Sequence, residues 1–275
     1  MKRIRITGAN GYIGTALKER LQGLPDRYET ETRSVRDFAA DSTDFHGVDA
    51  VVHAAAVVHR KETAKTAPLY DAVNRDLTFA IAKEAKRQGV RQFVFLSSLS
   101  VYGMETGVIT GETVPDPKTR YGRSKLEAER LIAPLADESF TVTVVRAPTV
   151  FGTGAKGNYR RLERLTKRLP FVPAFENRRS MASIDTLCEA LQSYLDDPKS
   201  GVFFPQEPQP VRTADLIARI AAEQGRTLKP TRLLNPAIRV FRFFTHGGKK
   251  AFGDLLYRGP DMLPLSEVFL EEESS

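Results

Sequence analysis

The chain has 275 residues, 41% hydrophobic and 27% charged, which is enough for one large α/β domain with a smaller lobe. Its formal net charge is +7, but basic and acidic residues are interleaved without a basic arm, so no nucleic-acid partner is expected. One cysteine, Cys188, excludes a disulfide framework, and the apolar run after Met1 is too short for a signal peptide or membrane span. We therefore expect a cytoplasmic globular protein without a membrane partner.

Strands and helices alternate from the first residues onward, which predicts βαβ units. The expected strands and helices, in chain order, are strand 2–7, helix 12–22, strand 28–33, strand 49–56, helix 70–88, strand 92–97, helix 120–135 and strand 140–146. The stretch between the second and third strands is short, so the sheet is expected to lack one strand there. The pattern predicts an α/β fold with a Rossmann-type doubly wound parallel sheet.

The composition of the sequence changes after residue 146, where prolines become frequent and the expected helices are short. We expect a dinucleotide-binding Rossmann domain over residues 1–150. Residues 151–275 are expected to form mainly a substrate-binding lobe, with a segment near 201–204 returning to the main sheet.

Three glycines with the spacing G-x-x-G-x-x-G lie between the first strand and the first helix. The first permits a tight turn, the second lets the backbone approach a pyrophosphate, and the third lets the helix pack close to the strand. Free N–H groups at the helix start attract phosphates. The residues expected to contact a dinucleotide are Gly8, Asn10, Gly11, Tyr12, Ile13 and Gly14.

The end of the second strand carries the signal for the type of dinucleotide. An acidic residue there binds the ribose 2′-hydroxyl of NAD, whereas an arginine suits the 2′-phosphate of NADP. Arg33, with Ser34 and Arg36 as helpers, favours NADP(H). Glu31 keeps NAD(H) open if the register differs by two residues.

Tyr121 and Lys125 are spaced i and i+4, which places them one turn apart on one face of a helix. A phenol with a pKa near ~10 is a poor acid or base at neutral pH, and a neighbouring cation lowers that pKa. We therefore expect Lys125 to lower the pKa of Tyr121 and to hold a ribose hydroxyl. A solvated helix face is the alternative interpretation.

The buried strand 92–97 runs into a cluster of serines. Residues at the carboxyl end of a parallel strand face the ligand crevice. Ser98 is expected to hydrogen-bond a substrate oxygen and position it for Tyr121, with Ser100 as the alternative if the loop register differs. Serines that only cap a turn would explain the same pattern.

These motifs follow one order along the chain: 7–14, His53–Ala56, Asn74, Ser97–Gly103, Tyr121-x-x-x-Lys125 and Arg146–Gly152. In that order the chain resembles the extended short-chain dehydrogenase/reductase family, the NAD-dependent epimerase/dehydratase group. The resemblance implies that Ser98, Tyr121 and Lys125 form a catalytic triad. It further implies that the cofactor is bound along Ala54, Ala55, Ala56, Asn74, Ser97, Tyr121, Lys125, Ala147 and Pro148.

In similar nucleotide-sugar enzymes an asparagine and an arginine hold the substrate diphosphate, and a guanidinium suits phosphate because it donates two parallel hydrogen bonds. The resemblance implies these roles for Asn158 and Arg179, with Arg178 as the alternative. The other expected substrate contacts are Ser98, Ser100, Tyr121 and Thr149. A surface arginine pair beside a helix-capping Asp185 is the structural alternative.

Within the family the chain looks similar to bacterial UDP-sugar 4-keto reductases and 4-epimerases of surface-polysaccharide synthesis. Dehydratases carry an acidic pair after the catalytic serine or threonine, whereas this chain has Leu99-Ser100. We expect NADP(H)-dependent 4-keto reduction of a UDP-linked (6-deoxy)hexosamine. The alternatives are a UDP-sugar 4-epimerase with tightly bound NAD and a non-catalytic NADP-binding regulatory protein.

Three further expectations concern metals, the core and assembly. The four histidines lack metal-ligand spacing, so no metal site is expected. His53 and Cys188 are expected in the core. The resemblance implies a homodimer formed through helices 70–88 and 120–135.

Overall fold

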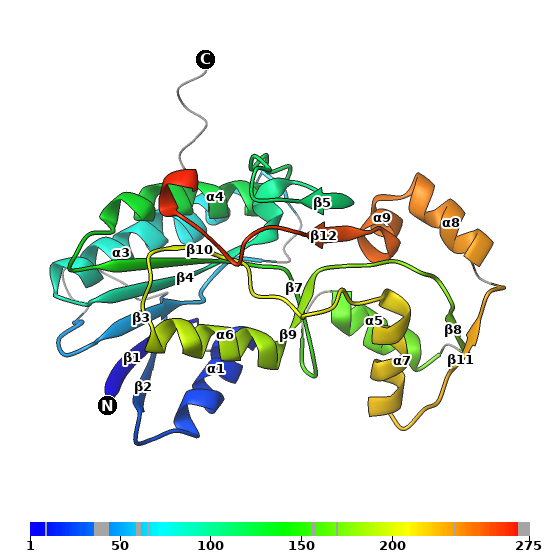
Figure 1. The fold of residues 1–275 in the computed structure, drawn as a ribbon, viewed down its shortest axis with the longest axis horizontal. Coiled ribbons are helices and arrows are strands. Elements are labelled where there is room, and N and C mark those ends of the chain that lie inside the picture. Colours follow the sequence, from blue (N-terminus) through cyan, green and yellow to red (C-terminus); the bar gives the residue numbers. More distant parts are fainter. Residues whose placement is uncertain are drawn as a thin grey trace, which may run out of the picture.

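The computed structural model describes residues 1–8, 10–35, 44–58, 62–64, 66–155, 158–168, 170–233 and 235–268. A twisted sheet lies between two layers of helices, and a smaller group of short strands and helices extends from one end of it (Figure 1). No described helix has the length and apolar character needed to cross a membrane.

The main sheet confirms the predicted doubly wound parallel architecture. Its strands, in spatial order, are β13 (Met262–Leu263), β10 (Gly201–Phe203), β6 (Thr141–Ala147), β4 (Gln92–Ser98), β3 (Ala50–His53), β1 (Lys2–Thr7) and β2 (Tyr28–Arg33). All neighbours pair parallel except β13, which pairs antiparallel with β10. Within the described residues no strand pairs with the outer edge of β2, in line with the expected loss of one Rossmann strand.

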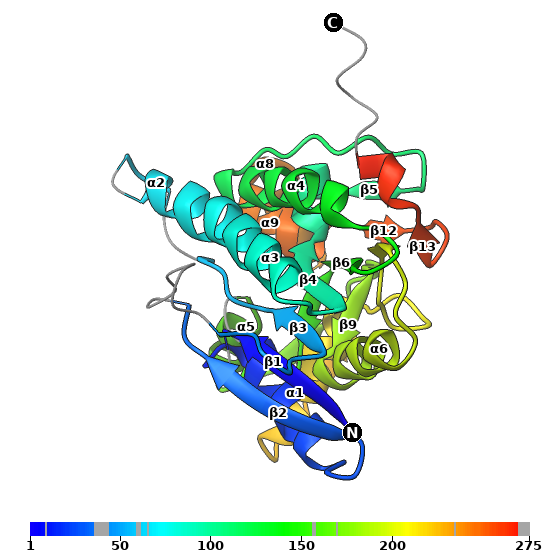
Figure 2. The same cartoon turned by 90° about the vertical axis from the view of Figure 1, so that its left-hand side faces the viewer.

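Helices cover both faces of this sheet (Figures 1 and 2). One face carries α1 (Tyr12–Gln22) and α6 (Ile184–Asp196), and the other carries α3 (Leu77–Arg87) and α4 (Arg120–Ile132). Side chains alternate along each strand, so β4 gives Val94 to the α1/α6 core and Phe93 to the opposite one. Both cores are apolar, which explains why the strands read as nearly continuous hydrophobic runs.

The helix predicted over residues 70–88 is broken into three pieces. A short helix α2 (Ala67–Tyr70) leads into a π-helical turn at Asp71–Asp76, and α3 follows. The wider turn brings Asn74, which is fully buried, toward the chain that leaves β3. Such π-turns are frequent at functional sites.

The remaining elements build the C-terminal lobe beside the carboxyl ends of the main strands. Its strand pairs are β7 (Thr149–Phe151) with β9 (Met181–Ser183), β5 (Gly107–Ile109) with β12 (Leu255–Tyr257), and β8 (Phe171–Pro173) with β11 (Lys229–Thr231). Its helices are α5 (Asn158–Thr166), α7 (Thr213–Glu223), α8 (Asn235–Phe244) and α9 (His246–Phe252). After β9 the chain returns from this lobe to the main sheet twice, first through α6 and β10 and later through β13.

Candidate active site

The glycine loop after β1 is shaped for close backbone approach. Gly8 has φ +75°, and a Cβ atom there would lie 2.6 Å from the backbone nitrogen of Ala55. The N–H of Gly11 donates to the carbonyl oxygen of Gly8 at 2.8 Å, which closes the turn. Only glycine combines this φ value with such close packing against the chain that leaves β3.

Helix α1 starts directly behind this loop without a side-chain cap. Gly11 is its N-cap, and Gly14 is buried within its first turn. The first N–H groups of the helix, at Tyr12, Ile13 and Gly14, therefore have no side-chain acceptor and keep their capacity to bind a phosphate. The loop and helix fit a dinucleotide pyrophosphate.

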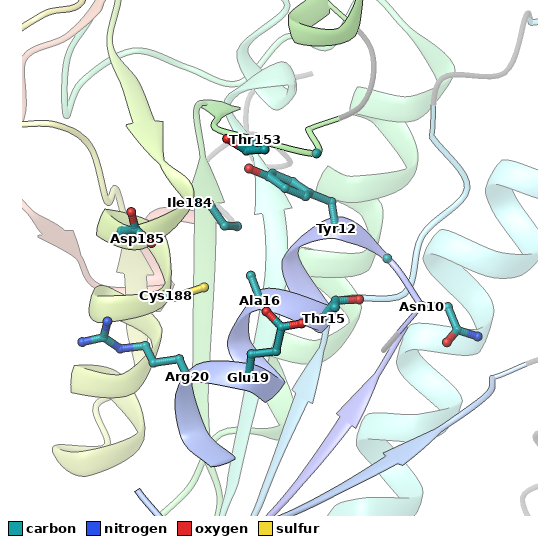
Figure 3. Close-up of a pocket in the computed structure, with 12 residues that line it drawn as sticks. Asn10, Tyr12, Thr15, Ala16, Glu19, Arg20, Thr153, Ile184, Asp185 and Cys188 are labelled. Atoms are coloured by element: carbon teal, nitrogen blue, oxygen red, sulfur yellow. The ribbon is translucent and has the colours of Figure 1, made fainter. Parts of the chain in front are cut away.

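The side chain of Tyr12 points away from the sheet edge, toward the loop at Thr153 (Figure 3). A pocket between α1 and the start of α6 is lined by Asn10, Gly11 and Tyr12 on one side and by Thr153 and Asp185 on the other. The buried hydroxyl of Tyr12 has no described hydrogen-bond partner, and burial raises the pKa of Tyr12 to about 12. The predicted contact of Tyr12 with a cofactor therefore involves its backbone N–H and not its side chain.

Asn74 fixes the segment that faces the glycine loop. Its Oδ1 accepts from the N–H of Val57 at 2.7 Å, and its Nδ2 donates to the Val57 carbonyl at 3.0 Å and to Ser124 Oγ at 3.1 Å. Both amide hydrogens are therefore used within the protein. Asn74 positions the stretch after Ala54–Ala56, which passes over Gly8, and its own contact with a cofactor stays a prediction.

Ser98, Tyr121 and Ala147 meet at the carboxyl edge of the sheet. Ser98 is the last residue of β4 and stands beside Ala147 in the parallel register with β6. A hydrogen bond joins Ser98 to Tyr121, which lies in the first turn of α4. The structure thus brings together residues that the sequence separates by more than 20 positions.

The serine cluster also caps a turn. Ser98 Oγ accepts from the N–H of Ser100 and donates to Ser100 Oγ, both at 3.1 Å, at the start of the 3-10 helix Leu99–Tyr102. The two interpretations of Ser98 are therefore compatible, because one hydroxyl both caps the turn and meets Tyr121. Ser100 is exposed at the same edge.

Gly122, which was not predicted from the sequence, explains how Tyr121 comes so close to this turn. A Cβ atom at Gly122 would lie 2.4 Å from the carbonyl oxygen of Ser100. Thr119 caps the helix by accepting from the N–H of Gly122 at 3.0 Å. Any side chain at residue 122 would push the start of α4 away from Ser98.

The expected lowering of the Tyr121 pKa by Lys125 is not what the described residues produce. Burial raises the pKa of Tyr121 to about 12, and the hydrogen bond with Ser98 only partly opposes this. Lys125 is buried, and its Nζ donates to the carbonyl oxygen of Leu96 at 2.7 Å. Burial lowers the pKa of Lys125 to about 7, with the Glu129 carboxylate opposing. Lys125 therefore ties α4 to β4, and Tyr121 is a protonated phenol at neutral pH.

A buried polar network behind the site was not predicted. Arg146 donates to both carboxylate oxygens of Glu129, at 2.6 and 3.1 Å from Oε2 and 3.3 Å from Oε1, and to the hydroxyl of Tyr102 at 2.7 Å. The hydroxyl of Ser97 donates to the same carboxylate. The predicted contact of Ser97 with a cofactor therefore stays a prediction for its backbone only. The signals were an arginine within an apolar strand and a glutamate one turn beyond Lys125 on the same helix face.

The acidic and the basic candidate for ribose recognition, at the end of β2, have different surroundings. Glu31 is engaged by the buried Arg5 in an ion pair, in the parallel register that places them side by side. Arg33 and Ser34 are exposed at the end of the strand. Arg36 lies outside the described residues.

Arg179 is buried in the C-terminal lobe. Its Nη1 donates to the carbonyl oxygen of Gly253 at 2.7 Å and of Glu105 at 3.4 Å, and burial lowers its pKa. No carboxylate of the described residues forms an ion pair with it, and its hydrogen bonds go to backbone carbonyl oxygens. Arg178 is exposed.

The other predicted substrate residues lie around the same lobe. Thr149 is exposed on β7, which continues from Ala147 and the buried Pro148. Asn158 is the first residue of α5, and its side chain lies outside the described residues.

Comparison with known proteins places this geometry among sugar-modifying enzymes. A family model described as NAD dependent epimerase/dehydratase family matches residues 4–196. A UDP-glucose 4-epimerase from Vibrio cholerae is 33% identical over 271 residues, covering 88% of this chain and 81% of the relative. An N-acetyl-alpha-D-glucosaminyl-diphospho-ditrans,octacis-undecaprenol 4-epimerase from Escherichia coli O157:H7 is 28% identical over 215 residues, 72% of this chain and 64% of the relative.

A solved structure of similar fold is the dTDP-4-dehydrorhamnose reductase of Bacillus anthracis in complex with NADP. It superposes with a TM-score of 0.70 and 16% sequence identity, and the match covers 98% of this chain and 97% of the other. At that identity the likeness concerns the fold alone.

Proposed function

Because the chain belongs to the NAD-dependent epimerase/dehydratase family and is an enzyme of the extended short-chain dehydrogenase/reductase type, we propose that it reduces the 4-keto group of a nucleotide-linked (6-deoxy)hexosamine. The observation that carries this proposal is the position of Tyr121, in the first turn of α4, beside Ser98 at the carboxyl end of β4, where burial keeps the pKa of the phenol high. A phenol in this state suits the donation of a proton to an oxygen, as carbonyl reduction requires.

The proposed division of labour follows from the positions of these groups. When bound, the nicotinamide supplies hydride to the carbonyl carbon. Ser98 orients the carbonyl oxygen, and Tyr121 gives its proton to that oxygen as it becomes an alcohol. Lys125 holds α4 against Leu96 and so keeps Tyr121 in place.

NADP(H) is the proposed dinucleotide. The carboxylate of Glu31 is already engaged by Arg5, whereas Arg33 is exposed at the end of β2. An exposed guanidinium there offers a partner for a 2′-phosphate. Arg33→Glu should reverse the preference, lowering kcat/KM with NADPH at least tenfold relative to NADH.

Arg179 is the proposed diphosphate ligand of the substrate. A buried guanidinium that meets only carbonyl oxygens gains from an anionic partner. The Escherichia coli relative is named for a sugar carried on undecaprenyl diphosphate, and the Vibrio relative for a UDP-sugar. Both carriers present a diphosphate, so the panel of test substrates includes sugars on each.

The function is tested with purified protein, NADPH or NADH, and a panel of UDP-, dTDP- and polyprenyl-diphosphate-linked 4-keto sugars. The expected result is consumption of NADPH with one 4-keto substrate, measured as the loss of NADPH absorbance.

Tyr121→Phe should keep cofactor binding and lower kcat about a thousandfold. Ser98→Ala should lower kcat strongly and Ser100→Ala only slightly, which separates the two serines. Unchanged turnover in Tyr121→Phe would defeat the proposal.

A 4-epimerase is the second candidate, favoured by the Vibrio relative of that name. An epimerase regenerates its cofactor in each cycle, so it would interconvert unmodified sugars without net NADPH consumption and would retain its dinucleotide through purification. That outcome would replace the reductase.

A further inference from the structure

Helix α8 presents large apolar side chains to the outside of the protein. Val240, Phe241, Phe243 and Phe244 have 58%, 46%, 74% and 75% of their surface exposed, and Leu233, just before the helix, has 87%. Exposed apolar residues are common singly, but a contiguous group of this size marks an interaction surface.

The outward orientation is a property of the helix and not of one side chain. Val240, Phe241 and Phe244, together with the exposed Ala237, follow the i, i+3, i+4, i+7 spacing of one helix face. The partly buried residue Asn235 anchors the helix, donating through Nδ2 to the carbonyl oxygen of Ala174 at 3.0 Å. An ordinary surface helix turns its apolar face to the core, and α8 does the opposite.

Positive charge is concentrated around the same helix. Residues 224–253 contain seven Lys and Arg and no Asp or Glu. Because the net charge of the whole chain is +7, the rest of the chain has equal numbers of acidic and basic residues. The expectation of evenly interleaved charge is therefore wrong for this segment. The exposed cations of α8, α9 and the turn before them are Arg232, Arg239, Lys249 and Lys250. Among the described residues none of these four has an ion-pair partner.

Helices α8 and α9 form one unit at the end of the molecule remote from β1 and β2 (Figure 1). Thr245 joins them: its N–H donates to the Phe241 carbonyl at 3.0 Å, and its Oγ1 caps α9 by accepting from the N–H of Gly248 at 2.9 Å. The lysines of α9 are therefore held close to the apolar face of α8. We call Leu233, α8 and α9 the apolar–basic surface.

We propose that the apolar–basic surface docks this protein on an anionic lipid surface. The apolar side chains enter the boundary between headgroups and acyl chains, while the arginines and lysines meet the anionic headgroups. A second copy of the chain fits less well, because a symmetric contact would bring two strongly basic segments together.

This placement differs from the expectation of no membrane partner, which rested on the lack of a spanning segment. Because α8 and α9 belong to the C-terminal lobe, docking also brings the proposed substrate site close to the lipid surface. The carbonyl oxygen of Gly253, at the end of α9, accepts from Arg179, the proposed diphosphate ligand.

The test is co-sedimentation of the full chain with phosphatidylcholine vesicles, with and without about 30% phosphatidylglycerol. We expect binding to the anionic vesicles, weakened by salt, and little binding to the neutral ones. The combined variant Val240→Ser, Phe243→Ser, Phe244→Ser and the variant Lys249→Glu, Lys250→Glu should each weaken binding at least tenfold. Matched controls are Leu131→Ser, exposed on α4, and Lys83→Glu, exposed on α3; both lie on helices of the main sheet and should bind as the unchanged protein.

Three outcomes would overturn the proposal: no binding to anionic vesicles, equal binding of the α8 variants, or a dimer without vesicle binding that the serine variant converts to a monomer. Turnover of a water-soluble substrate should be the same in all variants. That readout confirms the fold of each variant and separates failure of docking from failure of the proposed reaction.

Discussion

Two buried arginines in different regions of this protein have contrasting surroundings. Arg146, within the main sheet, donates to both oxygens of Glu129 and to the hydroxyl of Tyr102. Arg179, in the C-terminal lobe, donates to the carbonyl oxygens of Gly253 and Glu105. The first charge is in direct contact with a carboxylate, while the second donates to backbone carbonyl oxygens and forms no ion pair among the described residues.

The pKa directions express the same contrast. Burial acts to lower the pKa of Arg146, but the Glu129 carboxylate outweighs it and the pKa is raised. Burial lowers the pKa of Arg179, because only the more distant carboxylates of Asp254 and Glu105 oppose it. A paired buried charge has a structural role, whereas a buried charge without a carboxylate partner is poised for an anionic ligand.

The largest expected effect comes from breaking the pair in the sheet. Glu129→Gln leaves the Arg146 guanidinium buried without its counter-charge, which should lower the free energy of unfolding by about 3 kcal/mol or more. Glu127→Gln on the same helix is the matched control, since its ion pair with Arg75 is partly exposed and is expected to contribute less than about 1 kcal/mol. Urea denaturation measures both. Equal losses in the two variants would contradict the assigned difference between the pairs.

The region of the main sheet was largely predictable from the sequence. Alternating elements and the glycines at residues 8, 11 and 14 specify parallel strands with a phosphate loop, and parallel strands bring their carboxyl ends to one edge. The proximity of Ser98 to Tyr121 follows from that rule. The raised pKa of Tyr121 does not follow from that rule. It depends on the burial of the phenol and on the Nζ of Lys125, which donates to the carbonyl oxygen of Leu96.

The C-terminal region was predictable in its chemistry but not in its orientation. The spacing of the phenylalanines around residues 240–244 defines an apolar arc, yet only the tertiary structure shows that the arc faces outward. The state of Arg179 likewise depends on a contact with Gly253, which is 74 residues away in the chain. Contacts between irregular segments over such separations leave no local pattern.

A smaller effect is expected from His53, a buried group of the main sheet that is kept neutral rather than paired. Thr78 Oγ1 donates to the carbonyl of Asn74 and thus accepts from Nε2 of His53, while Nδ1 accepts from the hydroxyl of Thr7 at 2.8 Å. Burial lowers the pKa of His53 to about 3 from its ordinary value of 6.5. Between these values the unfolded chain binds the proton and the folded protein does not, so stability falls as the pH falls below 6.5.

The loss attributable to His53 between pH 7 and pH 5 should be about 2 kcal/mol. It is measured by denaturant titration at both pH values. Between pH 7 and pH 5, the drop in the free energy of unfolding should be smaller in His53→Asn than in the unchanged protein by this amount. His46→Asn, at an exposed position, should follow the unchanged protein. An identical pH response in His53→Asn would show that this histidine is not held neutral.

The smallest effect on stability, and the sharpest test of the contrast, is expected at Arg179. Arg179→Met removes a buried charge that has no carboxylate partner among the described residues, so the free energy of unfolding should change by less than about 1 kcal/mol. Arg146→Met leaves Glu129 buried and unpaired and should cost about 3 kcal/mol or more. The order reverses for substrate binding: Arg179→Met should raise the KM of the diphosphate-linked sugar at least tenfold, and the exposed Arg178→Met should raise it little. If Arg179→Met lost as much stability as Arg146→Met while its KM stayed unchanged, Arg179 would be a structural residue like Arg146, and the lobe would have to bind its diphosphate elsewhere.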